Sequence, residues 1–202
     1  HPTLALDAET GFALGLSNVQ LWTRSRERPD KEERDRAKLP IELKESYKWL
    51  ASAERSQRCY QRGEAKIITH IGDREADLYE EWATVPDRYN HVLVRVHQDR
   101  RLFGQTQSLY TYLSAQPCEG TYSVQVMADP RTGRTAREAL LGICCASVQI
   151  QRPEKLKGED YPPSIKLYAV EAKEVNPPDG QDPIHWRLMT THPVVAIEQS
   201  LQ

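Results

Sequence analysis

The residues with the clearest capacity for chemistry lie in a polar run that directly follows an apolar one. Ala65 to Ile71 is predicted to form a short buried strand that stops at Gly72 and Asp73, where a polar run with helical spacing begins. Asp73 is therefore expected at a strand end, where the sheet holds the carboxylate while its oxygens face outward. Such a carboxylate suits a divalent metal ion that substrate phosphate also binds.

Asp73 also has a simpler interpretation as the N-cap of the next helix. Asp is a favoured cap, and Glu75 and Asp77 would complement the dipole of a helix that begins at about Arg74. His70, three residues before Asp73, is expected on the opposite face of the strand, so we interpret it as a packing residue. Spacing alone leaves both roles of Asp73 open.

The elements before this run are predicted to be a hairpin, a charged loop and a helix. Thr3 to Asp7 and Gly11 to Trp22 have strand patterns and are joined by a short turn. Arg24 to Lys38 is almost entirely charged, which favours a solvated loop. A helix is expected from Pro40 to about Gly63. Its predicted apolar stripe consists of Leu43, Tyr47, Leu50 and Ala51.

After Asp73, one helix and one alternating strand are expected. The helix from about Arg74 places Leu78, Trp82 and Val85 on one face and ends before Pro86. His91 to His97 then alternates strictly. Val92, Val94 and Val96 fall on one face of that strand, and Leu93, Arg95 and His97 fall on the other.

Beyond about Gly104 the pattern predicts a mostly antiparallel β-rich region. Its strand-like runs, separated by turn clusters, are Tyr122 to Met127, Ala139 to Gln151, Ile165 to Glu174 and Ile184 to Thr190. Leu109 to Leu113 is short and ambiguous. An amphipathic helix is expected to begin at Pro193.

Composition limits the class of protein. The 202 residues suffice for one large domain or a core with an insertion. No apolar run approaches the roughly 20 residues that span a bilayer, and no leader pattern opens the chain, so we expect a cytoplasmic protein without membrane contact. The four cysteines show no C-x-x-C spacing and are expected to be reduced thiols. The net charge of −2 weakens a nucleic-acid function without removing it.

Three stretches together resemble a known family. Gly72 to Asp77 after an apolar strand resembles the second-aspartate signature of bacterial insertion-sequence transposases of the IS-four family. Glu45 to Leu50 agrees with that family upstream. Asn176 to Pro178 followed by Ile184 to Thr190 agrees downstream. The order and approximate spacing of the three stretches carry the resemblance.

The resemblance implies an α/β fold: an RNase H-like mixed sheet with flanking helices and an inserted, mostly antiparallel β subdomain. Residues 1–104 would be a partial catalytic core that lacks the first strand, and 105–192 would be the insertion. Residues 193–202 would start the helix that returns to the core, whose remainder is missing. Only two strands precede the first helix, which places Asp7 on the second strand of the meander, so Asp7 is left out of the metal site.

The activity implied is DNA transposition by a DDE transposase, a polynucleotidyl transferase that uses Mg²⁺ or Mn²⁺. Three carboxylates would hold two metal ions about 4 Å apart for phosphodiester cleavage and strand transfer. Asp73 matches the second carboxylate. The first would precede His1, and the last would follow Gln202 in a Tyr-x-x-Arg-x-x-x-Glu pattern, so this chain alone is expected to be inactive.

The resemblance also implies DNA contacts and partners. Trp186 matches a residue that stacks on a flipped base, and Arg95 matches one that contacts DNA phosphate. The partners would be transposon-end DNA, target DNA and a second copy in a homodimer of the full-length protein, near the bacterial nucleoid. From the pattern alone, Trp186 is equally well a core residue that alternates with Leu188 on a strand.

Two other functions remain open from the sequence. One is a non-catalytic DNA-binding or assembly module from a degenerate element. The other is an unrelated metal-dependent nuclease, which would need a complete carboxylate set within the chain. Asp7, Glu75 or Asp77 would then join Asp73.

Overall fold

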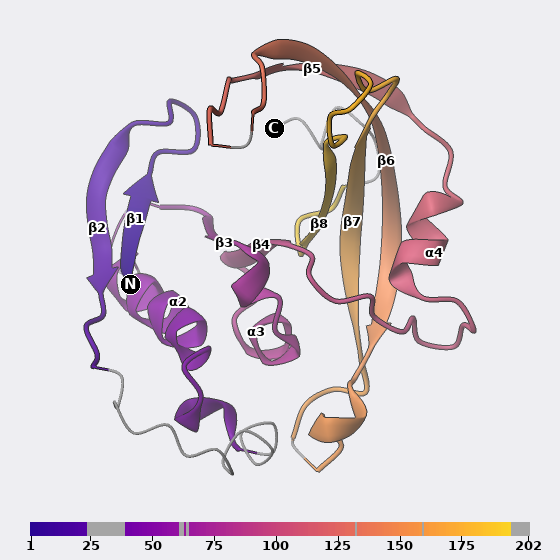
Figure 1. Cartoon of the computed structure of the whole chain (residues 1–202). Coiled ribbons are helices and arrows are strands. Elements are labelled where there is room, and N and C mark those ends of the chain that lie inside the picture. Colours follow the sequence, from indigo (N-terminus) through magenta and orange to yellow (C-terminus); the bar gives the residue numbers. More distant parts are fainter. Residues whose placement is uncertain (24–38, 61–62, 64, 132, 159, 195–202) are drawn as a thin grey trace. The chain divides into compact units, whose positions relative to one another are not determined.

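The structure is a computed structural model that describes residues 1–23, 39–60, 63, 65–131, 133–158 and 160–194 (Figure 1). These residues divide into two compact units. The first holds the described parts of His1–His70, Leu78–His91 and Pro153–Tyr161; the second holds Ile71–Asp77 and the described parts of Val92–Arg152 and Pro162–Gln202. The loop predicted at 24–38 and most of the helix predicted from Pro193 lie outside the described residues.

The predicted hairpin is confirmed in the first unit. Strands β1 (Pro2–Leu6) and β2 (Ala13–Val19) pair in antiparallel fashion. Asp7 closes the turn, because its Oδ1 accepts hydrogen bonds from the Oγ1 and the backbone N–H of Thr10 at 2.6 and 2.8 Å. These hydrogen bonds lower the pKa of Asp7. Asp7 thus has a structural role in the turn.

The helix predicted from Pro40 begins later than expected. A short 3₁₀ turn, η1 (Ile41–Leu43), ends at Lys44, whose extended backbone (φ −97°, ψ 148°) separates it from α2 (Tyr47–Tyr60). Leu43 is 69% exposed, so the prediction that it belongs to the buried stripe is wrong.

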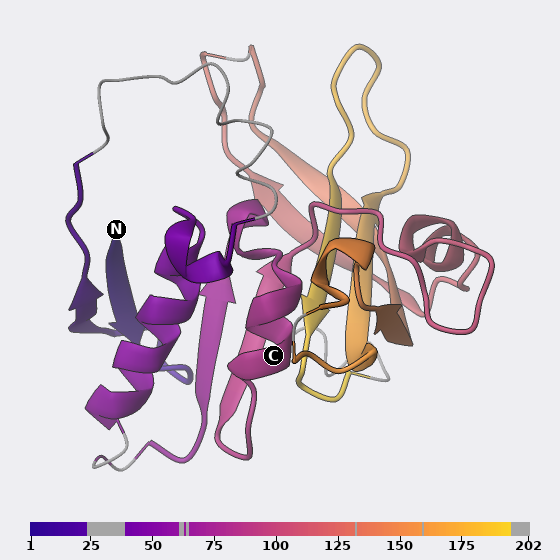
Figure 2. The same ribbon diagram turned by 90° about the horizontal axis from the view of Figure 1, so that it is seen from below.

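The buried face of α2 also differs from the predicted stripe, because it packs on the polar residues near the end of β2. Ser52, Ala53 and Ser56 are its buried residues. Ser17 Oγ lies 2.8 Å from Ser56 Oγ, and Asn18 Nδ2 donates to Ser52 Oγ at 3.3 Å. Figure 2 shows α2 beside the hairpin. Side chains that satisfy each other's hydrogen bonds form this interface, which an apolar period cannot reveal.

Six strands form one sheet in the order β3-β4-β8-β7-β6-β5. Their bounds are β3 (Ile68–Gly72), β4 (Asn90–Arg95), β5 (Gly120–Val126), β6 (Arg137–Gln151), β7 (Ser164–Glu174) and β8 (His185–Thr190). The pairs from β5 to β8, and β8 with β4, are antiparallel. The sheet as a whole is mixed, and with its helices the protein is an α/β protein. All four strands predicted after Gly104 are confirmed.

Burial in the two strands that flank the predicted site follows the sequence only in part. In β4, Val92 and Val94 are buried as predicted from the alternation. In β3, the prediction of a buried strand is wrong, because Ile71 is 71% exposed. Its apolar character alone therefore did not indicate burial.

Helix α4 (Leu109–Ser114) resolves the ambiguous stretch as a helix. It packs on β6 (Figure 1), and Leu109 and Leu113 are fully buried. Cys144 of β6 lies under it, with its Sγ 3.7 Å from the Leu113 carbonyl oxygen. On the opposite face of β6, Ile143 and Cys145 belong to a second apolar cluster. Among the described residues, no helix is long and apolar enough to cross a membrane.

Candidate functional site

Asp73 lies where the sequence predicts, immediately after β3, and its side chain is exposed. Its Oδ1 accepts the backbone N–H of Glu75 at 2.9 Å. This hydrogen bond caps a 3₁₀ turn, η2 (Arg74–Ala76), so the capping interpretation is confirmed. A carboxylate has further lone pairs, and one accepted hydrogen bond leaves capacity for a ligand.

The prediction of one continuous helix from Arg74 is wrong. The segment is divided between η2 and α3 (Tyr79–Thr84), with Asp77 at the break. Asp77 has ψ +68°, and its carbonyl oxygen accepts from Arg100 Nη2 at 2.7 Å and from Gln98 Nε2 at 3.2 Å. The carbonyl therefore accepts hydrogen bonds from a loop 21 to 23 residues further along the chain instead of from the next helical turn.

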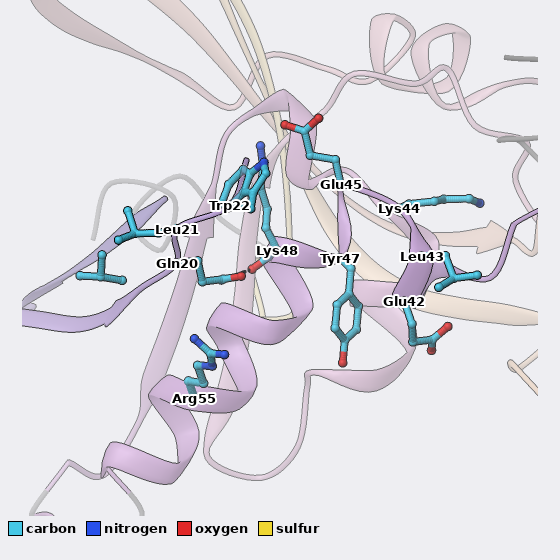
Figure 3. Close-up of a pocket in the computed structure, with 11 residues that line it drawn as sticks. Gln20, Leu21, Trp22, Glu42, Leu43, Lys44, Glu45, Tyr47, Lys48 and Arg55 are labelled. Carbon is cyan, nitrogen blue, oxygen red and sulfur yellow. Dashed lines mark hydrogen bonds between the residues drawn. The ribbon is translucent and has the colours of Figure 1, made fainter. Parts of the chain in front are cut away.

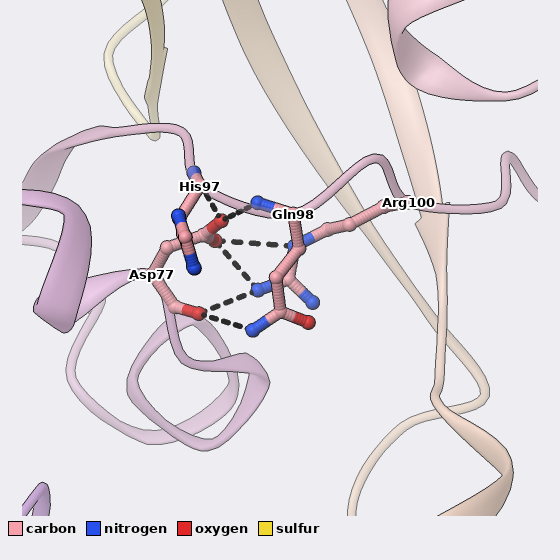
Figure 4. A network of polar contacts seen from close by, with 4 residues as sticks. All are labelled: Asp77, His97, Gln98 and Arg100. Atoms are coloured by element: carbon pink, nitrogen blue, oxygen red, sulfur yellow. Dashed lines mark hydrogen bonds and ion pairs between the residues drawn. The ribbon is translucent and has the colours of Figure 1, made fainter.

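The side chain of Asp77 is the most fully bonded group of the region (Figure 4). Its Oδ2 accepts the backbone N–H groups of His97 and Gln98, both at 2.9 Å. Its Oδ1 accepts from Arg100 Nε at 3.1 Å and from Nη2 at 2.5 Å. The two charged side chains are almost fully buried. Asp77 is thus a structural residue, with both carboxylate oxygens in use.

These contacts show that the ends of β3 and β4 and the start of β8 lie close together. The residues that follow β3 bond to the residues that follow β4, so both strands end at the same end of the sheet. Because β8 is antiparallel to β4, with Arg95 opposite Leu188, its first residues lie at that end too. We name this region the sheet end and define it by residues 73–77, 95–100 and 185–187. Carboxyl ends of parallel strands are the usual position for ligands in α/β sheets.

The three sequence-predicted site residues all belong to the sheet end. Asp73 follows β3, Arg95 is the last residue of β4, and Trp186 is the second residue of β8. Arg95 and Trp186 lie on the same face of the sheet, since Arg95 is opposite Leu188 and side chains two positions apart share a face. Among the described residues, no hydrogen bond or ion pair joins these three side chains directly.

Trp186 is 41% exposed and lies at the margin of an apolar cluster. Its neighbour across β7 is Ala172, and Leu188 follows on the same face; both belong to or pack on that cluster. The indole therefore combines one packed side with one accessible side, which is the arrangement that stacking on a base requires.

The opposite face of β8 carries a polar group that the sequence analysis did not select. Arg187 Nε donates to Oε1 of the buried Glu171 at 2.6 Å, and His185 Nε2 lies 2.8 Å from the same oxygen. The Arg187 guanidinium lies over the Tyr110 ring, 4.0 Å from its centroid. The alternation contained a signal, because His185 and Arg187 place two polar side chains on one face of a strand whose other residues are mostly apolar.

The electrostatics of this face extend to the turn of Asp73. Burial raises the pKa of Tyr110, and the negative charges of Asp77 and Asp99 raise it further. The positive charges of Arg187 and Arg74 lower it and so oppose part of that shift. The Tyr110 hydroxyl is therefore within electrostatic range of the residue next to Asp73.

Two other titratable groups have structural explanations. Burial, followed by the charge of Glu171, raises the pKa of Cys144 to about 11, so this thiol is not a nucleophile near neutral pH. Burial lowers the pKa of His70, which lies 3.4 Å from Asn90 Oδ1. Both observations fit residues that pack.

The donor set for a metal is limited within the described part of the chain. No group of three or more His, Cys, Asp or Glu side chains there is arranged to hold a metal ion. Asp73 offers the oxygen donor that Mg²⁺ prefers, but a single carboxylate is one ligand of a site that needs several. Asp77 does not add a second ligand, because Arg100 and two backbone N–H groups occupy it.

A separate hollow of about 580 Å³ lies in the first unit, between the end of β2 and the start of α2 (Figure 3). Gln20 Nε2 donates to the carbonyl of Lys48 in its wall at 2.9 Å. Its lining mixes apolar, acidic and basic side chains, including Leu21, Trp22, Glu42, Lys44, Glu45, Tyr47 and Lys48. Residues 24–38, which connect its two walls, lie outside the described residues, so we assign it no function.

The fold and the site together define an α/β protein with an exposed carboxylate, an arginine and a half-exposed tryptophan at one end of a mixed sheet. No protein-family model matches the sequence.

Proposed function

We propose that this chain is part of the catalytic core of a DDE transposase of the IS-four family, which cleaves and transfers DNA strands at transposon ends. The observation that carries the proposal is the position of Asp73. It is an exposed carboxylate at the end of β3, in a turn that the buried Asp77–Arg100 pair holds. Preorganised carboxylates of this kind suit metal-dependent phosphoryl transfer.

The order of elements supports the RNase H-like part of the proposal. A hairpin, a helix, a strand that ends in Asp73, a helix and a further strand follow one another as β1, β2, α2, β3, α3 and β4. In this assignment β3 and β4 are the neighbouring parallel strands of the core. The strands β5 to β8 belong to the inserted β subdomain. The other two carboxylates of the family's triad would lie outside residues 1–202.

Each site residue has a defined role in the proposed reaction. Asp73 would contribute one oxygen ligand to Mg²⁺ or Mn²⁺; the metal, when bound, would activate the attacking oxygen and stabilise the leaving one. Arg95 would bind a phosphate of the DNA strand, because a guanidinium can donate two parallel hydrogen bonds to it. Trp186 would stack on an unpaired base, which is worth about 1–3 kcal/mol. The partners would be transposon-end and target DNA, with a second copy of the complete protein.

The first test is the parent reading frame. Reading about 100 residues on each side, an ordinary domain length, should reveal a strand-borne Asp before His1 and a Tyr-x-x-Arg-x-x-x-Glu helix after Gln202. Natural chain ends, or other residues at those positions, would contradict the catalytic proposal.

The second test is biochemical. The protein expressed from the complete frame should nick DNA that carries the element's ends in the presence of Mg²⁺, and Asp73→Ala should abolish nicking. Trp186→Ala should slow formation of the DNA hairpin intermediate at the transposon end far more than the first nick. Equal slowing of both steps would exclude the stacking role.

A further inference from the structure

Arg187 is held in a fixed orientation by two independent contacts. Its Nε donates to Glu171 at 2.6 Å, and its guanidinium lies 4.0 Å from the centroid of the Tyr110 ring. The Glu171 side chain is 8% exposed and that of Arg187 is 19% exposed. A guanidinium oriented in this way loses little further conformational entropy when it binds a ligand.

The contacts leave the terminal nitrogens of Arg187 for a ligand. Within the described part of the chain, its hydrogen bond leaves from Nε alone. Nη1 and Nη2 carry the pair of parallel N–H donors that fit a phosphate or carboxylate. The aromatic ring covers one face of the guanidinium, so an anion would approach its edge.

Arg187 lies at the same sheet end as the proposed site residues. It follows Trp186 directly in β8, so the two side chains lie on opposite faces of the sheet at the sheet end. Arg74, next to Asp73, acts electrostatically on the same Tyr110 that supports Arg187. A ligand that lies across the sheet end would therefore meet Trp186 on one face and Arg187 on the other.

We propose that Arg187, oriented by Glu171 and Tyr110, is a DNA-binding residue that holds a backbone phosphate of the strand whose base contacts Trp186. The inference rests on the proposed function. DNA is the source of the phosphate in this proposal, because a free anion has no base that could stack on the accessible indole beside the site. A strand with both bases and phosphates uses both features.

The experiment measures the affinity of the 202-residue chain for a fluorescently labelled DNA duplex with a single-stranded end, by anisotropy over a range of salt concentrations. Arg187→Gln should raise Kd by about fivefold to tenfold and reduce the slope of log Kd against log salt by about one. Arg187→Lys keeps the positive charge but loses the pair of parallel N–H donors, so it should recover only part of the affinity. Tyr110→Leu should fall between the unaltered chain and Arg187→Gln.

The matched control is Arg131→Gln, since Arg131 is also ion-paired but its side chain is 89% exposed in the turn after β5. This change should alter Kd by less than about twofold. A thermal unfolding midpoint for Arg187→Gln close to that of the unaltered chain shows that the variant folds. If that midpoint falls, Arg187→Lys is the deciding comparison.

The outcomes separate the inference from the proposed function. If Arg95→Gln weakens binding and Arg187→Gln acts like Arg131→Gln, the inference is overturned and the proposed DNA contact stands. If the unaltered chain does not bind DNA, the inference is overturned, and the nicking assay with the complete protein then decides the proposed function. If inorganic phosphate binds in an Arg187-dependent way and DNA does not, the residue serves a free anion and the inference is overturned.

Discussion

Two aspartates of one short motif have opposite environments. Asp73 is exposed with one accepted hydrogen bond, while Asp77 is buried with both carboxylate oxygens bonded. They are four positions apart in sequence, and either could bind metal by residue type. Burial and pairing assign the structural role to Asp77, which leaves Asp73 as the candidate ligand.

This difference predicts that two similar substitutions reduce the free energy of unfolding by different amounts. Asp77→Ala leaves Arg100 buried without its partner and should reduce the free energy of unfolding by about 3–5 kcal/mol. Asp73→Ala removes only a cap and should cost about 1 kcal/mol or less. Urea denaturation of both variants checks this. Equal losses would contradict the assignment of roles.

His70 should make stability depend on pH. Burial lowers the pKa of His70 from its usual value of 6.5 in the folded chain. The unfolded chain then binds a proton at His70 more readily than the folded chain does. The contribution of neutral His70 to the free energy of unfolding is therefore present above pH 6.5 and is lost as the pH falls through the folded-state pKa of His70. The free energy of unfolding, measured between pH 8 and 5, should fall less steeply for His70→Gln. An unchanged slope in the variant would contradict the prediction.

The sequence predicted the positions of Asp73, Arg95 and Trp186 but not the contacts that orient the sheet end. Asp77 and Arg100 are 23 residues apart, and Tyr110 and Arg187 are 77 apart. Pairs at such separations depend on which strands become neighbours, and residue type and local spacing do not contain that information.

At the scale of elements, alternation in β4 and β-rich runs between turn clusters were the most reliable guides. Strands β4 to β8 follow their predicted ranges closely. Helical predictions failed where polar contacts replaced apolar ones: Ser52 and Ser56 of α2 bond to β2, and Asp77 divides the predicted helix. The order β3-β4-β8 required the structure, since β8 follows β4 by about 90 residues.

Helix α4 should contribute to the stability of the sheet through Leu113. Leu113 is fully buried against β6, whereas Leu140 of β6 is 42% exposed. Leu113→Ala should lower the free energy of unfolding by about 2–4 kcal/mol through lost burial and a cavity. Leu140→Ala, the matched control, should lower it by less than about 1 kcal/mol. Chemical denaturation compares them, and similar losses would show that α4 is not packed as described.

At the scale of the whole molecule, the charge distribution limits how DNA can bind. The chain has a net charge of −2, so its overall charge provides no long-range attraction to DNA near neutral pH. Affinity would then come from local contacts, such as Arg95, Arg187 and Trp186. A small number of phosphate contacts gives a shallow salt dependence.

The same balance predicts that DNA affinity rises as the pH falls from 8 to 6. Protonation of three of the six histidines already turns the net charge positive, and histidines ordinarily titrate near pH 6.5. Kd measured by anisotropy at fixed salt should therefore decrease over this range. A Kd that is constant from pH 8 to 6 would contradict a contribution of the overall charge to DNA binding.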